Sequence, residues 1–314
     1  MLTHQTGFPN WRNGKLAFEF VPGTQCPYSG EGFEYLAKAL ENKFHKPLEE
    51  LLDSILFKPL GMKDTRYWSA AVDRSRYARW HDSQGKEYET SYESGTSAAD
   101  FLLSTVKDYS TFMIYVMNGA GLSTSLFNDM VRPQVNVKKH VDKGLGWEVI
   151  SDLPNGEYSL QHGGGDRGVK TMGFILPKSR RGVVVFTNGD NGATVIDSIF
   201  ASSIDVGQEI LDFTNGAYTA PTIKLSNEIL EQYVGTYLRS DATGYNLFIT
   251  KFADSLQITG EGVPLMNLSA EKEDLFFIKG PGYRYEFIRD ESKKIVKMNI
   301  YDNDKLLLDA KKIK

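Results

Sequence analysis

Two short stretches of the sequence combine groups that could do chemistry. In "PYSGEGF", Tyr28 and Ser29 lie directly before a predicted helix that begins through two glycines. In "QHGGGDRG", His162 ends a predicted strand and three glycines follow it. Three glycines weaken a strand, so they make sense where another group must approach the backbone closely. Bare peptide N–H groups beside a histidine suit an oxyanion or a carboxylate, and the alternative is a bulged hairpin with a structural histidine.

The remaining reactive side chains indicate neither a metal nor a cofactor. Cys26 is the single cysteine, so no disulfide forms within the chain, and a lone cysteine is more often a small buried residue than a nucleophile. The five histidines are dispersed, without an i, i+4 pair and without cysteine partners at ligand spacing. We therefore expect no metal site and no cofactor.

Composition bounds the class of protein. With 314 residues, 41% of them hydrophobic, the chain is long enough for two domains with substantial cores. The net charge of −4 is mild and the basic residues are scattered, which argues against a nucleic acid or an anionic membrane as partner. No apolar run reaches the length of a transmembrane helix, and no signal peptide opens the chain.

Helices and strands alternate irregularly before residue 214. Apolar residues recur at helical spacing over 33–44, and Pro47 fits the first turn of a second helix, which ends before Pro59. Ser104 is the predicted cap of a third helix that the Asn-Gly pair at 118–119 ends. Its predicted inward face is formed by Tyr109, Phe112, Met113, Val116 and Met117. A further helix over 195–211 covers one face of a sheet, whose strands are predicted at 144–150, 158–164, 169–176 and 182–188.

The turns between these strands predict antiparallel hairpins, so this half belongs to the α+β class. The pattern changes after "FTNGAYTAPT", which has the composition of a linker. Short alternating runs punctuated by Gly, Asp and Asn then predict a small up-and-down β-barrel of about eight strands, with a packed interior rather than a ligand cavity. The predicted organisation is a domain at 1–213, a linker at 214–225 and a barrel domain at 226–314.

The order of several segments resembles a known family. These segments are "LTHQTGFPNW", "PGTQCPYSGEGFEYLAKALE", "ILFKPLGMKDTRYW", "LLSTVKDYSTFM", "GLGWEV", "HGGGDRG" and "GVVVFTNGDNG". Together they resemble the serine β-lactamase and penicillin-binding-protein-like family, with the nearest likeness to class C β-lactamases and the related esterases and D-amino-acid-specific peptidases. The resemblance covers about residues 1–213, and the barrel looks like the lipocalin-like domain often appended to such proteins.

The resemblance implies roles for particular residues. Tyr28 matches the tyrosine of the family's Tyr-x-Asn motif, which serves as general base and proton shuttle. His162 begins the match to the third motif and is expected to bind a substrate carboxylate or relay protons. The glycines after it would bind substrate and the oxyanion, with the N–H of the last as oxyanion donor: Gly163, Gly164 and Gly165.

The sequence departs from the family pattern at two motif positions. Gly30 replaces the asparagine of the second motif, and Gly163 replaces a threonine whose hydroxyl would grip a β-lactam carboxylate. Both changes favour an esterase or a D-peptidase-like hydrolase over a true β-lactamase, or an inactive relative. The expected reaction is hydrolysis of an ester, amide or β-lactam through an acyl-enzyme; the substrate is a small molecule or a peptide.

The nucleophile of the family is the serine of a Ser-x-x-Lys motif upstream of the "LTH-x-x-G" segment. The three matches in this chain, at 83–86, 104–107 and 269–272, all follow Tyr28. We therefore expect that this chain holds no nucleophile and begins just downstream of the catalytic helix. The parent protein would be exported, as relatives usually are. The competing hypothesis is a non-catalytic binding or regulatory protein, with the barrel as its ligand or partner module.

The run "GVVVFTN" predicts one more property. An unbroken apolar run marks a strand buried on both faces near the middle of a sheet. The chain supplies one neighbour, the hairpin partner at 169–176, and in the resembled family the other comes from the N-terminal segment. We therefore expect the edge at Val183–Asn188 to be open or filled by another polypeptide, with self-association as the consequence.

Overall fold

The computed structural model describes the chain except for residues 68–72, 90–94, 216–219, 242–243, 279–281 and 303–304. Part of the predicted linker at 214–225 and Trp68 of the quoted "TRYW" segment therefore lie outside the described residues. The chain divides into two compact units. The first is made of Met1–Ala78, Thr90–Gly163 and Met172–Phe186; the second is made of Arg79–Glu89, Gly164–Thr171 and Thr187–Lys314.

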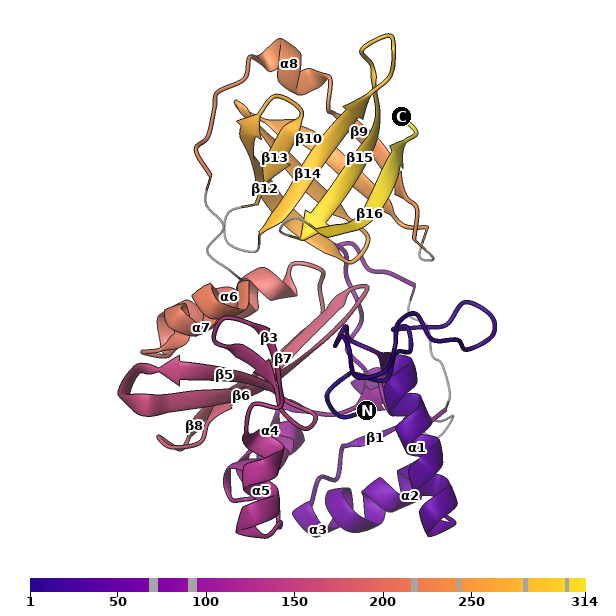
Figure 1. Ribbon diagram of the computed structural model, residues 1–314, viewed down its shortest axis with the longest axis vertical. Helices are drawn as coiled ribbons and strands as arrows, with labels where there is room; N and C mark the ends of the chain where they lie inside the picture. Colours follow the sequence, from indigo (N-terminus) through magenta and orange to yellow (C-terminus); the bar gives the residue numbers. More distant parts are fainter. Residues whose placement is uncertain (68–72, 90–94, 216–219, 242–243, 279–281, 303–304) are drawn as a thin grey trace. The chain divides into compact units, whose positions relative to one another are not determined.

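A six-stranded sheet carries one of the two candidate motifs (Figure 1). Its strands follow the chain in the order β3–β8. They are β3 (Val135–Lys138), β4 (Val141–Lys143), β5 (Glu148–Leu153), β6 (Glu157–Asp166), β7 (Val169–Leu176) and β8 (Arg181–Thr187). The pairs β3–β4, β4–β5 and β5–β6 are antiparallel. The turn of η3 (Pro154–Gly156) joins β5 to β6 with Asn155 in the left-handed region, at φ 60°, so the expected α+β fold with antiparallel hairpins is confirmed.

Strand β8 is the last strand in the order of this sheet. Its one neighbour in the described part of the chain is β7, as its hairpin connection predicted. Residues 1–29, all of which are described, contain no strand. The apolar run of β8 thus lies at a sheet edge, a place where unpaired N–H and C=O groups are available to another strand.

Helix α4 (Val106–Met117) packs against the sheet through the residues that its periodicity predicted. Met113 and Val116 are buried, in a core with Trp147 of the loop before β5 and Leu160 of β6. The helix ends at Asn118, as expected, but its cap is Thr105, whose hydroxyl accepts from the N–H of Asp108. The predicted cap, Ser104, instead shares a hydrogen bond of 2.8 Å with the Thr65 hydroxyl. Helix α5 (Thr124–Val131) follows.

The helical region before residue 61 differs from the prediction at Pro59. Helix α1 (Gly30–Phe44) is followed by α2 (Leu48–Leu52), the π-helical turn η1 (Asp53–Phe57) and α3 (Lys58–Leu60), so the chain stays helical through the proline. The wider π-turn, in which Lys58 N–H donates to Asp53 O, relaxes the clash that a proline makes in a regular helix. The end comes instead at Gly61, at φ 67°. Between this region and α4 lie the short strands β1 (Arg66–Tyr67) and β2 (Leu102–Leu103), which pair with each other, and the turn η2 (Arg74–Arg76).

The helix predicted over 195–211 is two helices, α6 (Gly192–Ser203) and α7 (Gly207–Asn215). The Asp205 carboxylate accepts from the N–H of Val206 and competes with helical pairing there. A Cβ at Gly207 would lie 1.9 Å from the carbonyl oxygen of Phe200, so the close return of the chain onto α6 requires glycine.

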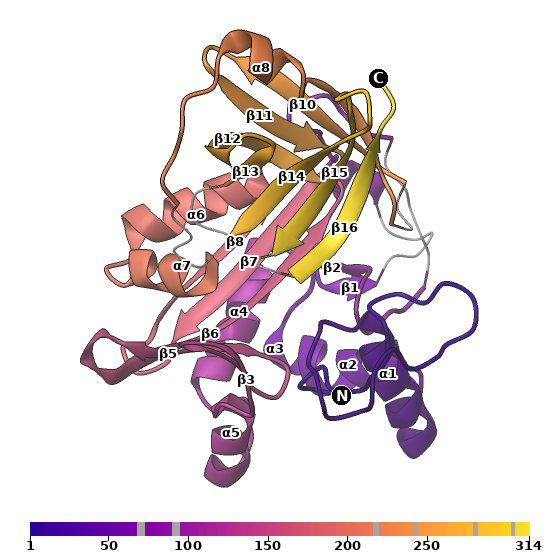
Figure 2. The ribbon, with the colours of Figure 1, turned by 45° about the horizontal axis from the view of Figure 1, so that its top comes forward.

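The second unit contains a closed barrel of eight antiparallel strands, which confirms the prediction (Figure 2). All of them lie within 235–312: β9 (Gly235–Arg239), β10 (Asn246–Phe252), β11 (Ser255–Gly260), β12 (Val263–Lys272), β13 (Leu275–Phe277), β14 (Tyr283–Arg289), β15 (Ile295–Asp302) and β16 (Lys305–Lys312). The buried rings of Tyr233, Tyr237, Phe276 and Phe287 stack edge to face inside it. The boundaries of the domains remain a prediction.

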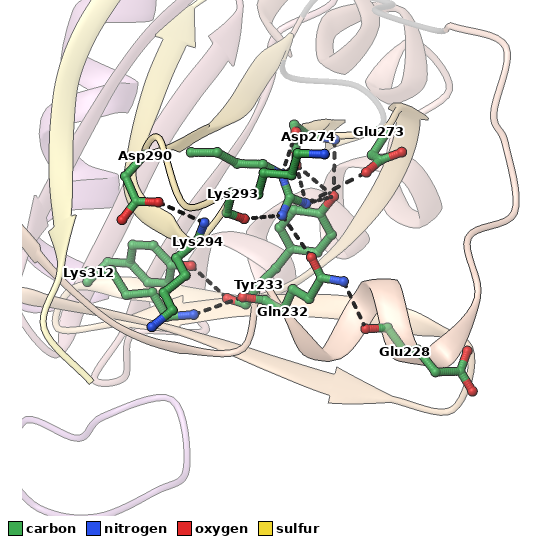
Figure 3. A network of polar contacts seen from close by, with 11 residues as sticks. Glu228, Gln232, Tyr233, Glu273, Asp274, Asp290, Lys293, Lys294 and Lys312 are labelled. Atoms are coloured by element: carbon green, nitrogen blue, oxygen red, sulfur yellow. Dashed lines mark hydrogen bonds and ion pairs between the residues drawn. The ribbon is translucent and has the colours of Figure 1, made fainter.

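A polar network lies next to the short helix α8 (Asn227–Glu231) on the barrel (Figure 3). The guanidinium of Arg289 binds both carboxylate oxygens of Asp274, at 2.9 and 3.0 Å, and donates to the side-chain oxygen of Gln232 at 2.7 Å. The Tyr233 hydroxyl donates to Asp274 at 2.9 Å. The network therefore ties the segment after α8 to β14 and to the turn before β13.

Candidate active site

Tyr28 is positioned by the start of α1. The hydroxyl of Ser29 accepts from the N–H of Gly32, at 3.0 Å, and donates to the carbonyl of Pro9, at 2.8 Å. Ser29 therefore caps α1, and its hydroxyl is engaged both as a donor and as an acceptor. The N–H of Gly30 donates to the side-chain oxygen of Asn10. A Cβ at position 30 would lie 2.8 Å from the indole of Trp11, which explains why glycine stands where the resembled motif has asparagine.

His4 lies next to Tyr28, and no role was predicted for it from the sequence. Its side chain is buried between the rings of Tyr28, at 4.4 Å between centroids, and Phe33, at 5.1 Å. The backbone N–H of Ser29 donates to His4 Nδ1 at 3.1 Å, so the proton of the neutral ring is on Nε2. Burial, with the Lys143 and His162 charges adding to it, lowers the pKa of His4 to about 4. His4 is therefore a neutral donor at neutral pH.

Tyr28 is accessible but is not ionised readily. Its side chain is 45% exposed, and its ring centroid is 6.4 Å from that of His162. Partial burial and the Asp100 carboxylate raise the pKa of the Tyr28 phenol. A tyrosine that acts as general base needs the opposite shift, from a nearby cation. Among the causes of its shift there is no lysine or arginine.

His162 reaches the same place from the sheet. It is half-buried on β6, and burial together with the Lys143 ammonium lowers its pKa below the ordinary value of 6.5. A neutral imidazole can donate a hydrogen bond or relay a proton, but it offers no permanent positive charge to a carboxylate. The lowered pKa of His162 is compatible with the proton-relay role, and both roles stay predictions.

These side chains surround a cavity of about 150 Å³ in the first unit. Its lining includes Leu2, His4, Tyr28, Lys143, Glu148 and His162. Lys143 pairs with Glu148 at 3.2 Å, and the Gln161 amide donates to the other oxygen of Glu148 at 2.7 Å. The polar side chains of this part of the lining are therefore bonded to one another. A volume of this size holds one small group, such as a single ring, rather than a whole drug-sized ligand.

The three glycines of β6 do not share one environment. All three are exposed, but Gly163 lines the cavity, whereas Gly164 and Gly165 are absent from its lining and belong to the second unit. A Cβ at Gly164 would lie 2.6 Å from the Thr171 hydroxyl of β7, so a cross-strand side chain makes the close approach there. The structure brings Tyr28, His162 and Gly163 together around one cavity.

Among the residues that the structure describes, no serine lines this cavity. The serines of the three Ser-x-x-Lys matches have other contacts or places. Ser83 shares a hydrogen bond of 2.8 Å with the Thr259 hydroxyl, Ser104 is bound to Thr65, and Ser269 is on β12 opposite Phe277. Cys26 is half-buried and is not part of the lining either. A hydroxyl nucleophile for Tyr28 is thus not supplied by the cavity lining.

The described residues contain no group of three or more His, Cys, Asp or Glu side chains that could hold a metal ion. Within the same described part, no helix is both long enough and apolar enough to cross a membrane.

The family model for Beta-lactamase matches residues 1–201. The chain belongs to the beta-lactamase family. Penicillin-binding protein 4* of Bacillus subtilis (strain 168) is 21% identical over 346 residues, a match that covers 93% of this chain and 73% of that protein. Over a segment of only 47 residues, 15% of this chain and 12% of the relative, the D-alanyl-D-alanine-carboxypeptidase/endopeptidase AmpH of Escherichia coli (strain K12) is 48% identical.

Solved structures share this fold at low sequence identity. The crystal structure of SurE has a TM-score of 0.58 at 18% identity, and the match covers 99% of this chain and 77% of that one. This likeness shows a shared fold, and the expected family is confirmed by the match of the family model to residues 1–201.

Proposed function

We propose that this protein is a serine hydrolase of the D-peptidase or esterase type, which acts by acyl transfer with Tyr28 as its general base. The observation that carries the proposal is the convergence of Tyr28, His4 and His162 on one cavity beside the backbone of Gly163. The groups that meet there are a phenol, two neutral imidazoles and the exposed backbone of Gly163, in a domain of the beta-lactamase family. A base and peptide N–H donors beside one pocket are the parts that acyl transfer needs.

The nucleophile in this proposal is the serine of a Ser-x-x-Lys segment that is not among these 314 residues. Tyr28 takes the proton of the serine hydroxyl while the serine oxygen attacks the substrate carbonyl, and it then gives that proton to the leaving group. The lysine of the same segment is the cation that the phenol needs. Its charge would oppose the burial and the Asp100 carboxylate, which raise the pKa of Tyr28.

The other groups have supporting roles. His162 relays protons or donates to the substrate, and Gly163, which lines the cavity, presents its backbone to the substrate. The substrate contact of Gly164 and the oxyanion role of the Gly165 N–H rest on the resemblance alone. Gly163 offers no hydroxyl for a β-lactam carboxylate, which favours esters and amides. The cavity of about 150 Å³ suits one small side chain at a time. A D-amino-acid amide or ester fits this size, in keeping with the carboxypeptidase and penicillin-binding relatives.

The test compares Tyr28→Phe with Tyr35→Phe in a protein that carries the encoded sequence upstream of Met1. Tyr35 is the matched control because it is an exposed tyrosine of α1 that contacts the ring of Phe8. With p-nitrophenyl esters and D-alanyl peptides as substrates, Tyr28→Phe should reduce the acylation rate by about 10²-fold or more, the usual scale for a general base. Tyr35→Phe should leave the rate unchanged. Equal rates in both variants, with a lower melting temperature for Tyr28→Phe, would make Tyr28 a structural residue.

The alternative is a non-catalytic binding or regulatory protein of the same family. Two observations favour it: the raised pKa of Tyr28 and a cavity lining without a serine. The encoded sequence directly upstream of Met1 separates the two hypotheses. An in-frame Ser-x-x-Lys there supports the enzyme, and its absence supports the binding protein. Export of the protein from the cytoplasm is part of the same proposal, because it rests on the resemblance.

A further inference from the structure

A completely buried carboxylate lies outside the candidate active site. Asp190, in the loop between β8 and α6, has no exposed surface. Its two oxygens accept three hydrogen bonds: from the N–H of Gly168 at 2.6 Å, from the Tyr88 hydroxyl at 2.7 Å and from the N–H of Gly262 at 3.2 Å. A buried carboxylate is costly unless such donors surround it, so these three groups are held together by its charge.

The three donors come from three separate segments of the second unit. Gly168 is in the turn between β6 and β7, Tyr88 is in the segment 79–89, and Gly262 is in the turn between β11 and β12 of the barrel. Gly168 has φ 74°, and a Cβ there would lie 2.7 Å from the side chain of Trp80. The turn is therefore shaped by glycine to fit closely against the segment 79–89.

The residue next to Gly168 is held by the same neighbours. The guanidinium of Arg167 lies over the ring of Tyr88, at 3.9 Å from its centroid, and forms an ion pair of 3.5 Å with Glu261. Arg167 of the β6–β7 turn thus contacts Glu261 of the barrel turn directly, and the next residue, Gly168, is linked to Gly262 through Asp190. Nearby, Asn191 accepts from the N–H of Leu265 on β12.

We propose that Asp190, Arg167 and the barrel turn 261–262 form a clamp that positions the glycine hairpin, residues 164–171. The barrel would then contribute to hydrolysis through its turn at 261–262 and not through its interior, because its own aromatic side chains fill the interior. The inference rests on the proposed function only for what the hairpin does, namely carry the oxyanion donor Gly165. Asp190 and Glu261 are positioning residues in this scheme, because they act through the turn and touch no substrate.

The test measures hydrogen–deuterium exchange of the amides of 164–171 in the whole chain, together with the melting temperature. Local exchange reports the opening of one segment, which a role in global stability alone would not change selectively. Glu261→Gln should raise exchange of the hairpin by up to about fivefold, the scale of a part-exposed ion pair. Asp190→Asn should raise it by at least about tenfold, the scale of a lost hydrogen bond to a charged group.

Glu271→Gln is the matched control, because Glu271 pairs with Arg284 at 3.3 Å on the same barrel with similar exposure. It should leave exchange of the hairpin unchanged. If Asp190→Asn does not fold, Glu261→Gln decides the question. The proposal is overturned if exchange of 164–171 stays at the wild-type level in Glu261→Gln, or if Glu271→Gln raises it equally. Neither readout depends on hydrolysis. The proposal of the clamp can therefore be refuted while the proposed function stands, and the proposed function can be refuted while the clamp stands.

Discussion

Acidification should destabilise this protein through His4, and the size of the effect follows from its environment. Folding lowers the pKa of His4 from 6.5 to about 4, chiefly through burial between Tyr28 and Phe33. The unfolded chain therefore binds more protons than the folded chain below pH 6.5. The stability that the neutral ring contributes is complete above that pH and is lost as the pH falls toward 4.

The expected loss can be worked out from this shift. Each unit of pKa corresponds to about 1.4 kcal/mol, so the free energy of unfolding should fall by about 3 kcal/mol between pH 7 and pH 4 on account of His4 alone. His162 acts in the same direction, because burial lowers its pKa also. The total effect of acid on the first unit should therefore exceed that of His4.

Urea unfolding at pH 7, 6, 5 and 4, followed by tryptophan fluorescence, measures this loss. The variant His4→Asn should be less stable at pH 7 but should lose about 3 kcal/mol less than the wild type on going to pH 4. The control His45→Asn replaces an exposed histidine at the end of α1, where Asn tolerates the φ of 52°. It should keep the pH dependence of the wild type. An equal pH dependence in His4→Asn and the wild type would refute the reasoning.

Three further outcomes are expected. The 314-residue chain should hydrolyse neither nitrocefin nor p-nitrophenyl esters above background, because no serine of the described residues lines its cavity; turnover abolished by Ser104→Ala would contradict this. Arg289→Met should lower the free energy of unfolding of the barrel by about 2 kcal/mol in calorimetry, the scale of a charged hydrogen-bonded pair. Lys297→Met, which breaks an exposed pair of 3.5 Å with Asp309, should cost little by comparison. The purified chain should self-associate in light scattering through the open edge of β8, and Val183→Lys should reduce this; a stable wild-type monomer would disprove it.

The elements with a strong period were predictable from the sequence. Alternating apolar residues and turn residues predicted the barrel and the bounds of β7, and the 3.6-residue period predicted the buried face of α4. Burial on one face produces a regular spacing of apolar residues in the sequence. The continuation through Pro59 and the break before Gly207 left no such trace. Both depend on local backbone geometry, a π-turn in one case and a close approach to Phe200 in the other.

The candidate site was predictable only in part, for a related reason. Tyr28 and His162 stood out because glycines follow each of them closely: Gly30 lies two residues after Tyr28, and Gly163 directly follows His162. His4 did not, because its role depends on contacts with Tyr28 and with the N–H of Ser29, which is 25 residues away in the chain. The direction of the pKa of Tyr28 was also beyond the sequence, since it results from partial burial and from Asp100, 72 residues further along.

The two departures from the family motifs have different physical meanings. At position 30 the chain has no room for a side chain, because the Trp11 indole and the Asn10 carbonyl occupy the space that a Cβ would need. The Asn10 side chain meanwhile brings an amide group to the same place, where its oxygen accepts from the N–H of Gly30 at 3.1 Å. Gly163 is exposed and lines the cavity, so its missing hydroxyl changes what the substrate meets. In the proposed hydrolase, position 163 is therefore the one expected to affect substrate choice, whereas the glycine at position 30 is explained by packing.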